Sequence, residues 1–366
     1  MTAQVASAQP VIQQSTTCHT VLAEVRNHIG HLTLNRPHAL NVIDLAMVRH
    51  LREQLDAWAS DDDVYAVVLR GAGEKAFCAG GDIRALYDSF NNQQTLHQDF
   101  FAEEYALALA LHHYRKPVLA LMDGLVLGGG MGLAQAVDLR VVTEHSRLAM
   151  PEVAIGYFPD VGGSYFLPRL PGELGIYLGV TGVQIQAADA LYCGLADWYV
   201  QRQNLALLDK QLDTMAWHAN PLKDLQGQLA KLGSQHLPDP PLATLRPAID
   251  HFFALPDIPS IIEQLRAVTV ADSHRWAMST ADLMQTHSPL AMAVTLELLR
   301  RGRRLPLLAC FELELHLDRQ WFERGNLIEG VRALIIDKDK KPHWNPAHVD
   351  AVDALHVATF FSGHEA

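Results

Sequence analysis

A layered α/β core followed by a mostly helical C-terminal region is the fold class that the sequence predicts. Three nearly continuous apolar runs, typical of strands buried on both faces, alternate with helical stretches in the first half of the chain. This order implies right-handed crossovers between parallel strands. Beyond about Ala187 the strand pattern fades and helical patterns dominate. We therefore expect a flexible tail at residues 1–17, the α/β core at 18–205 and the helical region at 206–366.

The core is expected to open with a β-hairpin and a helix. Residues 21–26 and 31–35 have strand patterns on either side of a turn at residues 27–30. Asp44 then has the position and residue type of a helix N-cap. The apolar residues of that helix recur three or four positions apart, at Leu45, Val48, Leu51, Leu55 and Trp58.

The remaining elements follow from the same patterns. Strands buried on both faces are expected at residues 64–70, 118–122 and 139–143. Helices are expected around residues 99–113 and from the glycine triplet at 128–130 onward. In the C-terminal region the strongest helical patterns lie near residues 290–301 and across 307–325.

Composition limits the classes of partner. The chain of 366 residues is 49% hydrophobic and 19% charged, which indicates a globular protein. A net charge of −12 argues against nucleic acid or an anionic membrane as partner. The apolar stretch at residues 117–137 contains Asp123 and five glycines, so we expect turns there and no membrane span. The oligomeric state is left open, and a homo-oligomer is compatible with the sequence.

The cysteines and the first residues bear on the cellular compartment. Four scattered cysteines without a CxxC pair suggest reduced thiols in a cytoplasmic protein, namely Cys18, Cys78, Cys193 and Cys310. Residues 1–17 contain no Lys or Arg and no long apolar run, unlike a secretory signal or a transit peptide. Because no HExxH motif or Cys/His cluster is found, and His112-His113 reads as a surface pair, we expect no metal site.

Two glycine-rich peptides follow predicted strands. Residues 75–83 contain Gly80-Gly81, and residues 128–132 contain four glycines. Each has an ordinary structural interpretation: the first is a tight turn capped by Asp82, and the second allows close packing of a helix on a strand. Each also has a functional one, because backbone without side chains lets a ligand carbonyl approach the N–H groups. Two such peptides in one core favour an oxyanion hole.

Two carboxylates occupy the loop at residues 150–163. Glu152 and Asp160 are surrounded by apolar residues, so both are expected to be partly buried. A partly buried carboxylate has a raised pKa and is either paired or functional. Ser164 lacks the GxSxG frame of a nucleophile elbow, so we do not expect it to act as a nucleophile.

The combined peptides resemble the crotonase (enoyl-CoA hydratase/isomerase) superfamily. The similarity is carried by residues 76–83, 100–105, 151–170 and 328–339, and it covers about residues 20–350. It is greatest to the 3-hydroxyisobutyryl-CoA hydrolase branch of that superfamily. The resemblance implies a crotonase-like spiral of ββα turns with a helical C-terminal region.

The resemblance also implies roles for particular residues. Gly81 and Gly129 match the donors of the two oxyanion-hole N–H groups, and Glu104 matches a substrate-contacting glutamate. The pair of Glu152 and Asp160 is similar to the carboxylate pair of the hydrolase branch.

One position separates the branches of the superfamily. Hydratases have a second glutamate just after the glycine triplet, whereas this chain has Gly132 there. The implied reaction is therefore hydrolysis of a short hydroxyacyl-CoA thioester, such as 3-hydroxyisobutyryl-CoA to 3-hydroxyisobutyrate and CoA in valine degradation. The implied partner is an acyl-CoA substrate, with no cofactor beyond the CoA that the substrate carries. The alternatives are an enoyl-CoA hydratase or isomerase and a non-catalytic acyl-CoA- or RNA-binding relative; the net charge and Glu152 speak against the second.

Overall fold

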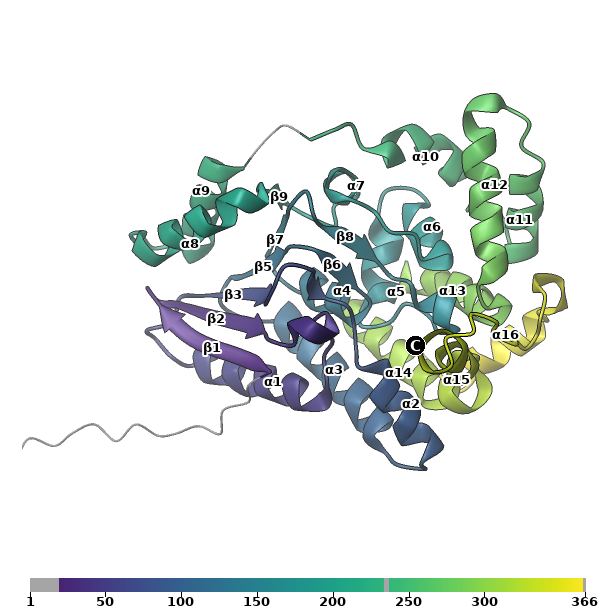
Figure 1. The fold of residues 1–366 in the computed structure, drawn as a ribbon, viewed down its shortest axis with the longest axis horizontal. Helices are drawn as coiled ribbons and strands as arrows, with labels where there is room; N and C mark the ends of the chain where they lie inside the picture. Colours follow the sequence, from purple (N-terminus) through teal and green to yellow (C-terminus); the bar gives the residue numbers. More distant parts are fainter. Residues whose placement is uncertain (1–19, 234–236, 365–366) are drawn as a thin grey trace, which may run out of the picture.

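The computed structural model describes residues 20–233 and 237–364 of the chain (Figure 1). The predicted tail at residues 1–17 and Cys18 lie outside the described residues. Strands are gathered on one side of the molecule, and helices of the C-terminal half surround the other side.

Nine strands of the described residues form two sheets. The larger sheet has the order β1-β2-β3-β5-β7-β9, with bounds Val21–Arg26, Ile29–Leu34, Ala66–Gly71, Val118–Met122, Leu139–Val142 and Trp198–Tyr199. The smaller sheet has the order β4-β6-β8, with bounds Ala76–Cys78, Leu125–Leu127 and Arg147–Ala149. All strand pairs are parallel except the β1–β2 pair.

From β3 onward, consecutive strands alternate between the two sheets, so the chain winds as a spiral. β3, β5 and β7 add neighbouring strands to the larger sheet, and β4, β6 and β8 add neighbouring strands to the smaller one. Each turn thus contributes one strand to each sheet before the chain crosses back through a helical segment. The predicted α/β spiral with parallel crossovers is confirmed.

The N-terminal hairpin is tighter than the sequence pattern predicts. Asn27 and His28 have φ values of 44° and 63°, and Arg26 pairs with Ile29. Positive φ at both central residues is typical of a two-residue type I′ turn, whose twist matches that of the strands. The second strand therefore begins at Ile29, two residues before the predicted start.

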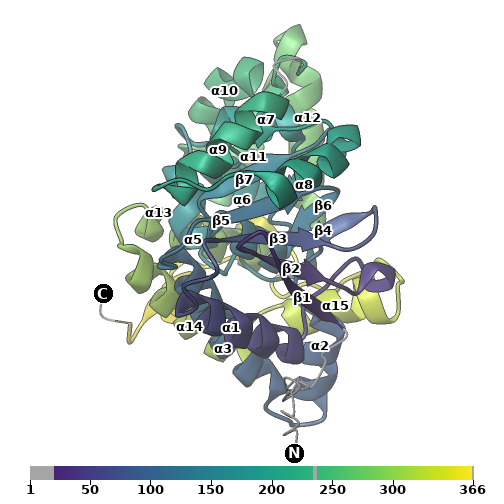
Figure 2. The same cartoon turned by 90° about the vertical axis from the view of Figure 1, so that its left-hand side faces the viewer.

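Both faces of the larger sheet are buried, which explains its nearly continuous apolar runs. One face packs against α1 (Leu45–Ala59) and α3 (Leu96–His112). The other face packs against α8 (Leu205–Thr214) and α9 (Pro221–Leu232), which lie in front of the strands in Figure 2. The predicted cap of α1 is confirmed, because the Asp44 carboxylate accepts a hydrogen bond from the Met47 N–H at 2.9 Å.

Short helices connect the strands of the spiral and lead away from it. Their bounds are α2 Ile83–Asn91, α4 Gly129–Gln135, α5 Gly163–Phe166, α6 Leu174–Thr181 and α7 Ala187–Cys193. The predicted helical C-terminal region is confirmed as α10 Pro241–Phe252, α11 Ile258–Arg266, α12 Ala271–Thr286, α13 Pro289–Gly302, α14 Leu307–Arg324, α15 Leu327–Val331 and α16 Ala354–Phe361. The division of the chain at residue 205 stays a prediction.

The apolar stretch at residues 117–137 is divided among β5, β6 and α4, as its turn residues suggest. No helix within residues 20–233 and 237–364 has both the length and the apolarity that crossing a membrane requires.

Candidate active site

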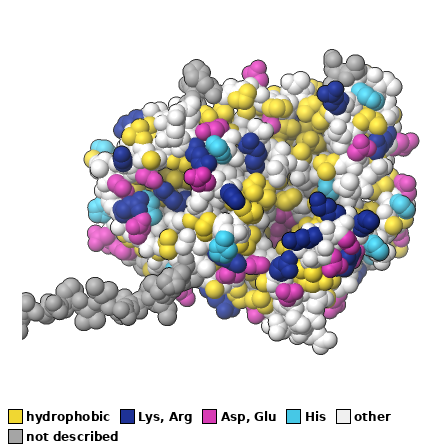
Figure 3. Space-filling view, in the orientation of Figure 1, with side chains coloured by type: hydrophobic (Ala, Val, Ile, Leu, Met, Phe, Trp, Pro, Cys, Tyr) yellow, Lys and Arg dark blue, Asp and Glu magenta, His cyan; other side chains and the backbone are white. Residues whose placement is uncertain are grey.

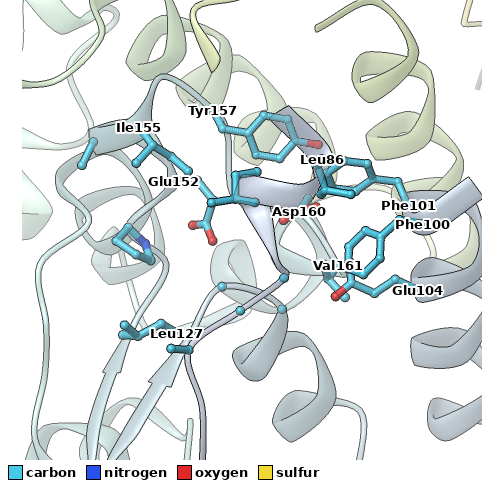
Figure 4. A pocket seen from close by; sticks show the side chains of 18 of the residues that line it. Leu86, Phe100, Phe101, Glu104, Leu127, Glu152, Ile155, Tyr157, Asp160 and Val161 are labelled. Atoms are coloured by element: carbon cyan, nitrogen blue, oxygen red, sulfur yellow. The ribbon is translucent and has the colours of Figure 1, made fainter. Parts of the chain in front are cut away.

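A cavity of about 270 Å³ lies where the smaller sheet meets α2, α3 and the loop after β8. All five residues singled out from the sequence line it: Gly81, Glu104, Gly129, Glu152 and Asp160. Figure 4 shows Glu152 and Glu104 approaching from opposite sides, with Asp160 between them. The rest of the wall is mainly apolar, from Ile83, Leu86, Phe100, Phe101, Leu127, Ala154, Ile155, Val161 and Ile335.

The two glycine peptides come together at one end of the cavity. A Cβ atom added to Gly129 would lie 3.5 Å from the Gly81 nitrogen. Gly129 is the first residue of α4, so its N–H has no acceptor within that helix. Gly81 forms an isolated parallel β-bridge with Ile43, in which the Ile43 N–H donates to the Gly80 carbonyl and the Asp82 N–H donates to the Ile43 carbonyl. The Gly81 N–H lies between these two bonds in the extended chain and therefore points away from Ile43. The arrangement suits two donors to one ligand oxygen.

The glycines of the triplet have different structural reasons. Gly128 has φ 51°, and a Cβ there would lie 2.6 Å from Glu152 Oε1. A Cβ on Gly129 would lie 2.5 Å from Glu104 Oε1, whereas one on Gly130 would meet the Cys78 carbonyl oxygen at 2.3 Å. Gly130 is therefore explained by close packing of the helix on the strand. At positions 128 and 129, the absence of a side chain leaves room for the carboxylates of Glu152 and Glu104.

Glu152 begins a short 3₁₀ helix, Glu152–Ile155, directly after β8 and Pro151. Its side chain is buried, and Oε2 has no hydrogen-bond partner among the described residues. Burial, followed by the charge of Asp160, raises the pKa of Glu152 well above its usual value. A carboxylate so poorly solvated is a stronger base and nucleophile than one in water.

Asp160 lies on the far side of the same loop and is also buried. The Tyr105 hydroxyl donates a hydrogen bond to Asp160 Oδ2 at 2.8 Å. Burial raises the pKa of Asp160 to about 7, and the bond from Tyr105 acts in the opposite direction. The next residue, Val161, has φ 51°, which is unusual for a β-branched residue and shows that the surroundings hold this loop firmly.

Glu104 comes from α3 and is 2% exposed. Its Oε1 atom has no hydrogen-bond partner among the described residues. Burial, followed by the charges of Asp160 and Asp318, raises its pKa well above the usual range. The negative charges of the neighbouring carboxylates thus act in the same direction as burial, because each disfavours the ionised form of the others.

Helix α14 contributes carboxylates that the sequence analysis did not single out. Glu314 accepts hydrogen bonds from the Gly162 and Ser164 N–H groups, both at 2.8 Å, and so holds the loop that carries Asp160. Burial raises the pKa of Glu314 to about 8. Asp318, one turn further on, accepts a hydrogen bond from the Tyr157 hydroxyl at 2.9 Å. The sequence did contain a signal for these two residues: Glu314 and Asp318 are four positions apart and lie on the apolar face of the helix predicted at residues 307–325.

Other groups weighed from the sequence are accounted for by packing. His112 is half-buried and contacts the rings of Tyr165 and Phe311, so the interpretation of His112-His113 as a surface pair is wrong for His112. The Ser164 hydroxyl donates a hydrogen bond to Glu314, and this contact explains the residue without a catalytic role. Within the part of the chain that the structure describes, no group of three or more His, Cys, Asp or Glu side chains has the arrangement of a metal site.

The two-sheet spiral and the backbone-lined cavity beside buried carboxylates define a crotonase-type protein. The family model described as enoyl-CoA hydratase/isomerase matches residues 29–361. The chain belongs to this family and therefore to the crotonase enzymes, which act on acyl-CoA.

Individual relatives carry different names. The chain is 38% identical over 340 residues to the mitochondrial 3-hydroxyisobutyryl-CoA hydrolase of Xenopus tropicalis, covering 91% of this chain and 86% of the relative. It is 36% identical over 336 residues to that of Homo sapiens, with the same coverage. Among solved structures, the carnitinyl-CoA dehydratase of Mycobacterium thermoresistibile has a TM-score of 0.86 at 37% identity, covering 94% of this chain and 96% of that one. An enoyl-CoA hydratase of Rhodobacter sphaeroides has a TM-score of 0.85 at 34% identity, covering 94% and 97%. These names agree on acyl-CoA chemistry and differ on the reaction.

Proposed function

We propose that the protein hydrolyses the thioester bond of a short 3-hydroxyacyl-CoA, with 3-hydroxyisobutyryl-CoA as the preferred substrate. The observation that carries this proposal is the meeting of Glu152 and Asp160 with the N–H groups of Gly81 and Gly129 in one cavity. Donors for an oxyanion beside a desolvated carboxylate are the parts that acyl transfer to water requires.

The reaction follows from this arrangement. The thioester oxygen accepts hydrogen bonds from the Gly81 and Gly129 N–H groups, which stabilise the negative charge of the tetrahedral intermediate; one such donor is worth roughly 3–4 kcal/mol of barrier. Glu152 either attacks the carbonyl carbon and forms an acyl-enzyme anhydride, or removes a proton from an attacking water. The C–S bond then breaks and the thiolate of CoA takes a proton, which comes from the water that is consumed. On the direct route this step gives the carboxylic acid; on the anhydride route a water then hydrolyses the anhydride, which releases the acid and regenerates the Glu152 carboxylate.

Asp160 gives the proposal its substrate class. With a pKa of about 7 and a hydrogen bond from Tyr105, Asp160 holds a polar group of the substrate in an otherwise apolar wall. A 3-hydroxyl group on the acyl chain is such a group, and the relatives named above act on a 3-hydroxyacyl-CoA by their names. On this basis we assign the protein to the step of valine degradation that releases 3-hydroxyisobutyrate. We place it in the cytoplasm from its cysteines alone.

Basic side chains follow one residue of the cavity wall closely in the sequence, and we propose that they contact the phosphates of CoA. Ile335 lines the cavity, and the segment that follows carries Lys338, Lys340 and Lys341, all exposed. Figure 3 shows Lys and Arg side chains gathered to the right of the centre of this face, where Figure 1 places α15. Lysines near a cavity mouth attract a phosphorylated ligand.

Enoyl-CoA hydratase or isomerase is the alternative function, since one solved relative is named a hydratase. Against it, Gly132 replaces the second glutamate that the resemblance to hydratases requires. A Cβ at Gly132 would lie 2.3 Å from Val161 Cγ1, so the strained Val161 occupies the room for a side chain there. If the protein added water to a double bond, Glu152 would have to act without the second glutamate that serves as its acid/base partner in hydratases.

The test compares two reactions on one preparation. Free thiol is measured with 3-hydroxyisobutyryl-CoA and 3-hydroxypropionyl-CoA, and hydration is measured as loss of the enoyl absorbance of crotonyl-CoA. We expect thiol release to be far faster. Glu103→Gln serves as a control variant because Glu103 is an exposed neighbour of the site, paired with Arg49. Efficient hydration of crotonyl-CoA without thiol release would establish the alternative.

A further inference from the structure

A second cleft, separate from the cavity of the proposed active site, has a volume of about 510 Å³. It is formed by the end of α2, the start of α3 and one face of α14, and it shares no lining residue with the first cavity. Its rim carries the exposed side chains of Asn91, Gln94 and Glu323, so it opens to solvent. The proposed hydrolysis makes no use of this cleft.

Two polar side chains in the wall of this cleft are buried and only half satisfied. Asp318 is 4% exposed and His97 is 7% exposed. Asp318 Oδ1 accepts a hydrogen bond of 2.9 Å from the Tyr157 hydroxyl, and His97 Nδ1 lies 3.3 Å from Ser89 Oγ. The remaining polar atoms, Asp318 Oδ2 and His97 Nε2, have no hydrogen-bond partner among the described residues and are not enclosed by protein. Both atoms are therefore held in place and available to a ligand in the cleft.

Two opposite charges of α14 also line the cleft without pairing. Arg319 and Glu323 are exposed and lie four residues apart, a spacing at which opposite charges on a helix can meet. Neither forms an ion pair with any of the described residues. The cleft thus offers a positive and a negative group that do not neutralise each other.

The apolar part of the cleft is aromatic. The ring of Phe322 lies between those of Phe90 and His97, with centroid distances of 5.5 Å and 4.6 Å, and Phe90 and His97 are 5.6 Å apart. Such a cluster of rings packs an apolar or aromatic group, and the ring faces attract a neighbouring cation.

We infer that this cleft binds a free α-amino acid with an aromatic or other apolar side chain. The ammonium group of the ligand contacts Asp318 Oδ2, its carboxylate contacts Arg319, and its side chain packs on the rings of Phe90 and Phe322. A zwitterion matches both charges of the cleft, whereas a simple cation or anion leaves one of them unmatched. This site is independent of the proposed function.

The electrostatics of Asp318 fit an ammonium ligand. Burial raises the pKa of Asp318 well above its usual value, while the bond from Tyr157 and the charge of Arg319 act in the opposite direction. A cation placed at Oδ2 favours the ionised carboxylate in the same way as Arg319 does.

Binding of L-phenylalanine to the full-length protein, measured by calorimetric titration, tests the inference. We expect one saturable site with a Kd on the order of 1 mM or tighter, from the binding energy per atom of small ligands. N-acetyl-L-phenylalanine lacks the ammonium group and L-phenylalaninamide lacks the carboxylate. Each should bind at least ~10-fold more weakly, because each loses a charge-assisted hydrogen bond.

Variants assign the two contacts. Arg319→Gln should weaken binding of L-phenylalanine by at least ~10-fold and leave the weaker binding of L-phenylalaninamide unchanged. Asp318→Asn keeps an acceptor for Tyr157, and it should weaken L-phenylalanine by at least ~10-fold but not N-acetyl-L-phenylalanine. Glu312→Gln is the matched control, since Glu312 is exposed on the same helix outside the cleft, and it should keep the wild-type affinity.

Four results would overturn the inference. The first is no saturable binding of L-phenylalanine at concentrations about 10-fold above that Kd. The second is equal affinity for the amino acid and its two analogues. The third is wild-type affinity in both Arg319→Gln and Asp318→Asn, which would place the ligand elsewhere. The fourth is a loss in Arg319→Gln that is equal for the acid and the amide. None of these measurements involves thiol release, so their outcome leaves the hydrolase proposal untouched.

Discussion

Replacing Asp160 by Asn should make the protein more stable and less active, and the gain in stability should grow with pH. Burial raises the pKa of Asp160 from its ordinary 3.8 to about 7 in the folded protein. The folded state therefore binds this proton more tightly than the unfolded state does, so ionisation of Asp160 destabilises the fold as pH rises from about 4 to 7. Asn keeps the acceptor for Tyr105 and cannot ionise.

The magnitude follows from those two pKa values. One pKa unit corresponds to 1.36 kcal/mol, so Asp160 lowers the free energy of unfolding by about 2 kcal/mol at pH 5 and about 4 kcal/mol at pH 8. A constant difference in packing between Asp and Asn cancels when the two pH values are compared. The expected change between pH 5 and pH 8 in the stability difference of variant and wild type is thus about 3 kcal/mol.

Urea unfolding of both proteins at the two pH values measures this change, and thiol release from 3-hydroxyisobutyryl-CoA measures the loss of activity. Asp209→Asn is the matched control. Although burial acts to raise the pKa of Asp209, its bonds to Arg70 lower it, so the group is ionised in both states at pH 5 and at pH 8. This control should destabilise the protein by the same amount at both pH values.

The reasoning fails if the stability difference between Asp160→Asn and wild type does not change between pH 5 and pH 8. It also fails if the change has the opposite sign, with the variant gaining at low pH. An unchanged difference would mean that Asp160 is already ionised in the folded protein at pH 5, and the proposed hydrogen-bonding role at neutral pH would lose its basis.

Three further predictions concern the reactive groups and the cavity mouth. Glu152→Gln should lower kcat for thiol release by about 10²–10⁴-fold while equilibrium dialysis shows acyl-CoA binding retained; near wild-type turnover would rule out Glu152 as base or nucleophile. Gly129→Ala places a Cβ 2.5 Å from a glutamate oxygen and should lower kcat by at least about 10²-fold in a folded protein, whereas Gly227→Ala, with open space around it, should be fully active. Replacing Lys340 and Lys341 by Ala should raise KM without changing kcat, and the KM of the variant should depend less on salt concentration than that of the wild type. A change in kcat with an unchanged KM would mean that these lysines do not contact CoA.

The sequence predicts the elements whose side chains repeat with a clear period. Strand β5 was predicted with its observed bounds because every one of its five residues is buried. The short strands β4, β6 and β8 were not predicted, since three residues cannot display a period. Their pairing into a second sheet depends on the spiral path of the chain, which local patterns do not encode.

The candidate site divides in a similar way. Glu152 and Asp160 were predictable because a carboxylate in an apolar, glycine-rich loop has no other obvious use. Glu314 and Asp318 were not, because α14 meets the loop only after a separation of about 150 residues. Each side chain reads as an ordinary acidic residue of a helix until the fold places it under the loop. The resemblance to known peptides supplied the roles proposed for Gly81 and Gly129, because glycine spacing alone left packing and catalysis both open.

The electrostatics of the cavity connect its glycines to its carboxylates. Unpartnered acceptor atoms such as Glu104 Oε1 and Glu152 Oε2 cost stability, because buried polar groups without hydrogen bonds lose their hydration. A fold can tolerate them where a ligand supplies the missing contacts. The same glycine peptide that keeps Cβ atoms off both oxygens also presents a free N–H at Gly129. An acyl-CoA bound there would receive a donor on its carbonyl oxygen and meet a poorly solvated carboxylate on its carbon. The stability that these carboxylates cost is thus the source of the reactivity proposed for them.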